Sequence, residues 1–155
     1  MASIENALTQ HHKIGIDTSV FIYHFESNAK YLPLTTTILE GIQNGRWRAV
    51  TSVITLMEIN VHPWRMGKPR IAQTYETLLT HFPNLRIIDT NRDIARKAAQ
   101  IRATYNFRSA DALHIATAIN SGATAWVCND KQHRRLSNIL DVFVLDDFLE
   151  YLKLE

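Results

Sequence analysis

Four acidic residues stand out in this sequence because of the segments that precede or carry them. Asp17 directly follows a short apolar segment, and Asp130 follows another within two residues, while Glu58 and Asp111 lie in the two most apolar helical stretches. Two carboxylates about 5 Å apart, at an effective dielectric constant near 20, repel each other by roughly 3 kcal/mol. If the four side chains converge, a cation must compensate them. All-oxygen ligands favour a hard ion such as Mg²⁺ or Mn²⁺.

The chemistry that such a cluster supports is phosphodiester hydrolysis. A divalent cation lowers the pKa of an attacking water and neutralises charge on the leaving oxygen. No nucleophilic side chain is then required. The acidic residues therefore predict a metal-dependent nuclease.

Each acid taken singly also has a structural explanation. Asp17 and Asp130 could be helix N-caps, a role that stabilises by about 1 kcal/mol. Asp111 could be a first-turn acid that interacts with a helix dipole, and Glu58 could be a solvated residue on an amphipathic face. Only their convergence separates the two interpretations.

The elements that position these residues alternate along the chain. Short apolar or β-branched segments predict strands at Ile14–Ile16, Trp47–Thr51, Leu85–Asp89, Ala123–Cys128 and Val142–Leu145. Helical periodicity predicts helices at Tyr31–Asn44, Val53–Trp64, Arg70–Phe82, Arg92–Tyr105, Ser109–Ser121 and Asp146–Leu154. This order predicts an α/β fold with a central, mostly parallel sheet flanked by helices on both faces. In such folds the site lies beyond the carboxyl ends of the strands.

Two of the helices are unusually apolar. The helix at Ser109–Ser121 carries apolar residues almost all round, so we expect it to be buried. The helix from Val53 is similar, since only Thr55, Glu58 and His62 form a polar stripe on it.

Composition limits the class of protein. The length of 155 residues fits one domain, and residues 1–12 are expected to be a polar, frayed N-terminal extension. The net charge of +2 makes no whole-protein case for nucleic acid. The single cysteine, Cys128, excludes a disulfide framework and a multi-cysteine zinc site. Without an apolar leader or a run of about 20 apolar residues, the chain is expected to be cytoplasmic and not membrane-bound.

Four segments carry a resemblance to a known family. They are Ile16-Asp17-Thr18-Ser19-Val20-Phe21-Ile22, Ser52-Val53-Ile54-Thr55-Leu56-Met57-Glu58-Ile59, Ser109-Ala110-Asp111-Ala112-Leu113-His114-Ile115-Ala116-Thr117-Ala118 and Val127-Cys128-Asn129-Asp130. In these segments and in their order, the chain resembles PIN-domain ribonucleases, and in size and layout the VapC-type toxins of toxin–antitoxin systems. The first and third segments are the most specific.

The resemblance implies residue roles and partners. Asp17, Glu58 and Asp111 would form a Mg²⁺ or Mn²⁺ site that Asp130 completes, and the substrate would be RNA. A small antitoxin and a homodimer are implied as partners. PIN proteins often have Ser or Thr where this chain has Cys128, and a thiol supports Asp130 less well than a hydroxyl.

Further residues near the four acids are candidates for supporting roles. Thr18 and Ser19 could bind a metal-bound water or a phosphate, although helix capping explains them equally well. His114 lies on the same helical face as Asp111, but a core histidine with a satisfied ring is the better explanation. The other supporting or substrate-binding candidates near Asp130 are Asn129, Lys131 and Arg134.

Basic clusters could hold the RNA backbone. They comprise Arg65, Lys68 and Arg70 with Trp64, then Arg92, Arg96 and Lys97, and finally Lys131, Arg134 and Arg135. A solvated helix face is the usual explanation of such charges and is favoured for the second cluster. Trp64 and Phe107 could stack on bases, although buried aromatic residues are commoner.

Two other classes of protein remain open. A PIN-fold protein that binds RNA or regulates without cutting it would keep the same pattern. Haloacid-dehalogenase phosphatases also have an aspartate after a strand, but a second aspartate follows it two residues later, where this chain has Ser19. Neither G-x-G-x-x-G nor G-x-x-x-x-G-K-[ST] occurs, which disfavours nucleotide-binding folds.

Overall fold

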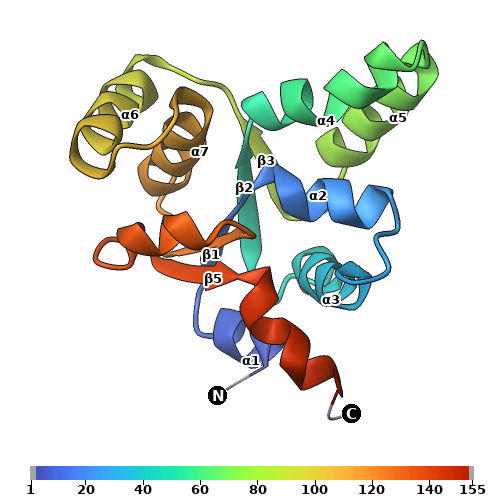
Figure 1. The fold of residues 1–155 in the computed structure, drawn as a ribbon, viewed down its shortest axis with the longest axis horizontal. Coiled ribbons are helices and arrows are strands. Elements are labelled where there is room, and N and C mark those ends of the chain that lie inside the picture. The colour runs from blue at the N-terminus through green and yellow to red at the C-terminus, as the bar shows by residue number, and fades with distance from the viewer. Residues whose placement is uncertain (1–2, 154–155) are drawn as a thin grey trace.

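A five-stranded sheet lies at the centre of the fold in a computed structural model that describes residues 3–153 (Figure 1). Its strands are β1 (Lys13–Ile16), β2 (Arg48–Ser52), β3 (Leu85–Ile88), β4 (Ala125–Cys128) and β5 (Asp141–Val144). The α-helices are α1 (Ile4–Thr9), α2 (Thr18–Phe25), α3 (Leu32–Gln43), α4 (Ile54–Arg65), α5 (Pro69–Thr80), α6 (Arg92–Tyr105) and α7 (Ser109–Asn120). Two 3₁₀ segments, η1 (Lys131–Leu136) and η2 (Leu145–Lys153), complete the chain.

The strand order is β3-β2-β1-β4-β5, and every pairing is parallel. From β1, the chain adds β2 and then β3 on one side, and it then adds β4 and β5 on the other side of β1. The strand order therefore reverses between β1 and β4. In open α/β sheets this reversal opens a crevice at the carboxyl ends of the two strands, where ligands bind.

Helices cover both faces of the sheet, as predicted. One apolar cluster joins the sheet to α1, α2 and α3, and includes Ile14, Val20 and Ile38. A second joins the opposite face to α6 and α7, and includes Ile101 and Ile115. Figure 1 shows α6 and α7 on the opposite side of the sheet from α2 and α3.

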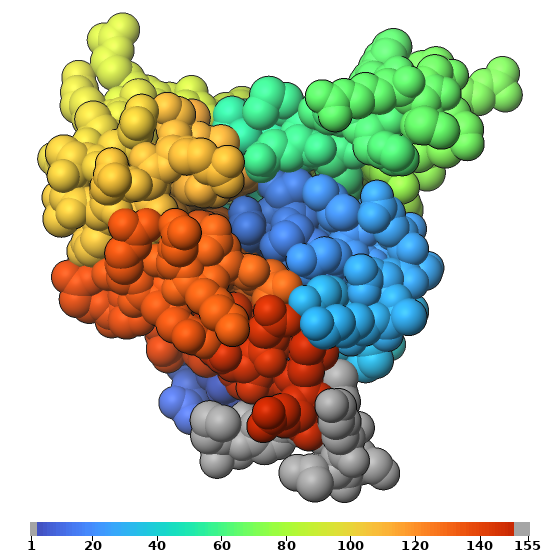
Figure 2. All heavy atoms as spheres, in the orientation of Figure 1, coloured from blue at the N-terminus to red at the C-terminus, as the bar shows by residue number. Residues whose placement is uncertain are grey.

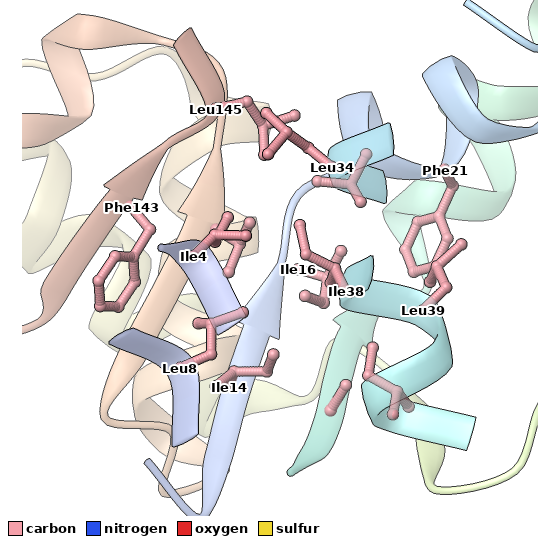
Figure 3. Packing of buried hydrophobic residues seen from close by; sticks show 14 of the residues in the cluster. Ile4, Leu8, Ile14, Ile16, Phe21, Leu34, Ile38, Leu39, Phe143 and Leu145 are labelled. Carbon is pink, nitrogen blue, oxygen red and sulfur yellow. The ribbon is translucent and has the colours of Figure 1, made fainter. Parts of the chain in front are cut away.

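The prediction of a frayed N-terminal extension is wrong for its described part. Residues Ile4–Thr9 form α1, whose N-cap Ser3 accepts a hydrogen bond from the Asn6 N–H. Ile4 and Leu8, four residues apart, point to one face and are buried. Figure 3 shows them packed beside Phe143 and Ile14 of the sheet. Residues 1 and 2 of the predicted extension lie outside the described part.

Gly15 brings α7 close to the middle of β1. A Cβ built on Gly15 would lie 2.6 Å from the Cβ of Ala118 and 2.8 Å from Cε3 of Trp126. Real Cβ atoms do not approach so closely, so the absence of a side chain permits this packing. Asp111 lies two turns before Ala118 on the same helix. The close packing of Ala118 on Gly15 therefore helps to set the distance between the Asp111 side chain and the sheet.

The other predicted elements match the structure within a few residues, with three differences. Helix α2 and the segment η1 were not predicted. The last predicted helix, at residues 146–154, is a 3₁₀ segment instead, and residue 154 lies outside the described part. None of the helices in residues 3–153 is both long and apolar enough to cross a membrane.

Helix α7 is buried, as predicted, but the expectation that α4 is similar is wrong. Met57 and Trp64 on α4 are 57% and 64% exposed, and Val61 between them is exposed too. Helix α4 packs on the fold with one side only, because its contacts are mainly with α5 and α2. In the space-filling view, α4 and α5 (teal to green) project from one corner of the molecule (Figure 2).

Candidate active site

Two of the four acids follow the strands between which the sheet order reverses. Asp17 comes directly after β1, and Asp130 comes two residues after β4. The backbone N–H of Asp17 donates to the carbonyl of Val127 at 2.9 Å, which holds the two strand ends side by side. Both residues therefore stand at the crevice expected from the topology.

Asp111 and Asp130 converge on one buried imidazole. Nε2 of His133 lies 3.9 Å from Oδ1 of Asp111 and 3.7 Å from Oδ2 of Asp130. The second oxygen of Asp111 lies 3.7 Å from Nε of Arg108, whose side chain is 90% exposed. Helix α7 thus brings its first-turn acid to the loop after β4.

Asp130 also makes the N-cap contact that its structural explanation requires. Its Oδ1 accepts from the N–H of Gln132 at 2.9 Å, at the start of η1. The Cys128 thiol approaches only the backbone carbonyl of Asp130, at 3.7 Å. Burial raises the pKa of Cys128 to about 12, so the group stays a thiol. Cys128 is a core residue and gives the Asp130 carboxylate no direct support.

Asp17 does not act as its structural explanation requires. It occupies the N-cap position of α2, yet its side chain accepts no capping hydrogen bond. Its Oδ2 accepts from the Ser19 hydroxyl at 3.3 Å. Burial raises the pKa of Asp17, and the neighbouring His114 offsets part of that rise. An uncapped, desolvated carboxylate at the crevice is what a cation site needs.

Glu58 is held by a buried polar group rather than by solvent. Its Oε1 accepts from the Thr18 hydroxyl at 2.8 Å and contacts Nε2 of His114. Thr18 in turn lies 3.0 Å from the hydroxyl of Thr55. The hydroxyl of Thr18 is thus committed within the protein, which removes it from the candidates for direct substrate binding.

The Glu58–His114 contact shifts both groups toward their charged forms. Burial lowers the pKa of His114, but the hydrogen bond to Glu58 and the charges of Asp17, Glu58 and Asp111 outweigh it, so that the pKa is raised. Burial likewise opposes ionisation of Glu58, but the contact with His114 outweighs it and lowers the pKa of Glu58. Three of the four acids therefore act on one imidazole.

The expectation that His114 has a satisfied ring is wrong. Its Nε2 is bound to Glu58, but its buried Nδ1 has no hydrogen-bond partner among the described residues. His114 is a buried residue of α7, as expected, and its imidazole links that helix to Glu58 on α4.

Other predicted supporting residues have structural partners. Asn129 donates to the Tyr23 hydroxyl and accepts from the N–H of Asp146, so both ends of its amide are engaged. Arg134 pairs with Asp147, whereas Lys131 is exposed. The structure thus places Lys131, but not Asn129, where it could meet a substrate.

The remaining basic and aromatic candidates divide in the same way. The guanidinium of Arg135 lies over the Phe107 ring, which is itself buried and out of reach of bases. Arg96 pairs with Asp93 on its own helix. Trp64, by contrast, is exposed beside Arg65.

The donor set fits a hard divalent cation that uses few protein ligands. Within residues 3–153, no three His, Cys, Asp or Glu side chains lie close enough together to bind one ion in common. Mg²⁺ commonly needs only one or two carboxylates, with waters and substrate phosphates completing its shell. Asp111 and Asp130 form such a pair, and Asp17 follows the neighbouring strand β1. That all four acids bind metal stays a prediction.

Sequence reasoning missed two residues at this site. The sequence patterns single out the three basic residues around His133 but not His133 itself, and they do not indicate Arg108. Each lies three residues from a site acid, His133 after Asp130 and Arg108 before Asp111. That spacing within a turn was the available signal.

Comparisons with known proteins identify the family. The PIN domain family model matches residues 14–139, which is most of the chain. The chain therefore belongs to the PIN domain family, as its sequence motifs indicated. No curated protein matches it at a significant level.

Two solved structures share the fold. A toxin-antitoxin complex from Klebsiella pneumoniae aligns with a TM-score of 0.64 and 22% identity over 85% of this chain and 97% of that one. VapBC2 from Rickettsia felis, bound to a DNA fragment from their promoter, aligns with a TM-score of 0.64 and 17% identity over 85% of this chain and 98% of that one. At these identities the likeness concerns the fold.

Proposed function

We propose that this PIN-domain protein is a Mg²⁺- or Mn²⁺-dependent endoribonuclease. The observation that carries the proposal is the convergence of Asp111 and Asp130 on one buried histidine, with Asp17 at the end of the strand beside β4. Asp111 and Asp130 would hold the metal directly, and Asp17 and Glu58 would reach it through bound waters. The bound cation would supply an activated water and neutralise the leaving oxygen.

The chain's own residues would bind and orient the RNA. Arg108 is almost fully exposed beside Asp111, so its guanidinium is free to meet a phosphate next to the scissile one. Lys131, the residue after Asp130, is also exposed. The hydrogen-bonded group of Thr18, Glu58 and His114 ties α2, α4 and α7 together and thereby fixes the helices that carry the acids.

The direct test is cleavage of RNA by the purified protein. Single-stranded and looped RNA should be cut with Mg²⁺ or Mn²⁺ and left intact with EDTA, and Asp17→Asn should lose most of the activity. Cleavage that resists EDTA would refute the metal mechanism. A folded protein that binds RNA but never cuts it would instead be a non-catalytic PIN protein.

We also propose that the protein is the toxin of a toxin–antitoxin pair and forms a homodimer. Two structures with the same fold are described as a toxin-antitoxin complex and as VapBC2. Beside Glu58, a pocket between α2, α4 and α5 is lined by Phe25, His62 and Tyr75 among others. A segment of the antitoxin would lie in this pocket and across the acids, excluding RNA.

Growth measurements test the toxin proposal. Expression of the wild-type chain alone should slow growth, whereas Asp17→Asn should not. Harmless expression of a folded, cleaving wild type would refute the toxin role without touching the nuclease. Sedimentation of the purified chain as a monomer would refute the homodimer.

A further inference from the structure

His133 is a buried histidine in which one ring nitrogen has a hydrogen-bond partner and the other has none among the described residues. Its side chain is 1% exposed. Nδ1 lies 3.0 Å from the indole Nε1 of Trp126, and Nε2 has no hydrogen-bond partner among residues 3–153. Because buried polar groups are rarely left unpaired, this nitrogen calls for an explanation.

The contact with Trp126 fixes where the ring carries its proton. An indole N–H can only donate, so Nδ1 of His133 must be the accepting, unprotonated nitrogen. The ring proton is then on Nε2. His133 thus presents an N–H donor toward the crevice, and its tautomer is set by the core.

The donor faces the gap between two site acids. Oδ1 of Asp111 and Oδ2 of Asp130 are 3.9 Å and 3.7 Å away, just beyond direct hydrogen-bond length. The other oxygen of each acid faces another partner, which is Arg108 for Asp111 and the Gln132 N–H for Asp130. A small side-chain rotation or one bridging water would engage the N–H with either acid.

The imidazole plane has little freedom to turn away. The Phe107 ring meets it edge-on, with the ring centroids 5.2 Å apart, and the Trp126 ring is inclined by 28°, with the centroids 6.3 Å apart. An apolar side chain could fill the same space without leaving a polar atom unpaired. Packing therefore explains the location of His133 but not its second nitrogen.

We propose that His133 is a positioning residue of the acidic site, whose Nε2–H holds Asp111 and Asp130 at the spacing that a divalent cation requires. The inference rests on the proposed metal-dependent function. Hydrogen bonds from outside the coordination shell orient carboxylate ligands, and their loss typically weakens metal affinity by about 10- to 100-fold. His133 would therefore act on metal binding and not on the RNA.

The test measures Mn²⁺ binding to the full chain by titration calorimetry, without RNA. His133→Leu should weaken Mn²⁺ affinity about tenfold or more, and His133→Gln, which keeps an N–H near the same point, should recover part of it. In RNA cleavage, His133→Leu should need more Mn²⁺ for half-maximal activity and approach the wild-type rate when Mn²⁺ saturates. A purely structural residue would change stability without this shift.

Phe107→Leu is the matched control, because it loosens packing on the same imidazole and removes no donor. It should lower the melting temperature and leave Mn²⁺ affinity unchanged. Equal Mn²⁺ affinity in the wild type and folded His133→Leu would overturn the inference and spare the proposed function. If His133→Leu does not fold, equal affinity in Trp126→Phe, which releases the tautomer, overturns it. A wild type that binds no Mn²⁺ and cuts no RNA overturns both.

Discussion

Replacing Asp111 by Asn separates a helix-stabilising acid from a metal ligand. In the structure the Asp111 carboxylate has two stabilising roles. It faces Arg108 at 3.7 Å, and it lies in the first turn of α7. Because Arg108 is 90% exposed, the ion pair is worth at most about 1 kcal/mol. The dipole interaction adds a few tenths to about 1 kcal/mol.

The net loss of stability should be smaller than these two contributions together. Asn removes one negative charge from a site that also holds Asp17 and Asp130, which relieves repulsion. Its carbonyl oxygen keeps the shape and the acceptor toward His133. We therefore expect Asp111→Asn to change the free energy of unfolding by about 1 kcal/mol or less in EDTA.

Its effect on cleavage should be far larger. A lost metal ligand raises the barrier by several kcal/mol, and each 1.4 kcal/mol is about tenfold in rate, so activity should fall by roughly 10²-fold or more. Cleavage of a fluorescently labelled RNA over a Mn²⁺ titration, together with thermal unfolding in EDTA, measures both quantities on the same preparation.

Asp93→Asn is the matched control. Asp93 lies in the first turn of α6 and pairs with Arg96 at 3.0 Å, three residues on, so it has the same two structural roles away from the crevice. It should show a similar small change in stability and full activity. Wild-type, EDTA-sensitive cleavage by folded Asp111→Asn, or an equal loss in both variants, would refute the assignment of Asp111.

Three further predictions concern stability in EDTA. The pKa of His114 in the folded protein is raised above its ordinary value of 6.5. The charged imidazole therefore contributes its whole stabilisation below pH 6.5, and this contribution is lost as the pH rises through the pKa of the folded state. The pKa of Glu58 is lowered, so its own contribution is lost only in acid. The melting temperature should therefore fall as the pH rises above 6.5, and Glu58→Gln should flatten that slope; an unchanged slope would contradict the pairing. Gly15→Ala should destabilise by about 1–3 kcal/mol through its clash with α7, and a neutral result in urea unfolding would show that α7 moves freely. Leu8→Ala should cost about 2–5 kcal/mol, and a cost near zero would mean that α1 does not belong to the core.

Much of the fold could be predicted because its long helices and buried strands repeat their apolar residues clearly. Helix α6 begins and ends where predicted, since Asn91 caps its start and Asn106 adopts a left-handed conformation at its end. Helix α2 was missed because its residues, mostly aromatic or β-branched, also suit a strand. Helix α1 has only two buried residues, and its place in the core depends on distant strands.

The sequence predicts at which edge of the sheet the site lies, but not how its side chains interact. Topology alone predicts that the residues after β1 and β4 meet. The state of each side chain depends on contacts between distant segments. Trp126 determines the tautomer of His133 through its indole N–H. Thr18 donates a hydrogen bond to a carboxylate oxygen of Glu58, which is 40 residues away in the sequence. Periodicity also cannot tell which apolar face other elements leave uncovered, and the exposure of Met57 on α4 was missed for that reason.

Because Gly15 has only a hydrogen atom as its side chain, α7 packs on β1 at the shortest distance that the two backbones allow. A larger side chain at this position would push α7 away from the sheet. Asp111 would move with the helix, whereas Asp17 and Asp130 would stay at the strand ends. The geometry of the crevice could thus be tuned from inside the sheet, with all the acids intact. Mutational scans should then find a second class of inactivating substitutions, which keep the chemistry of the site but alter its dimensions.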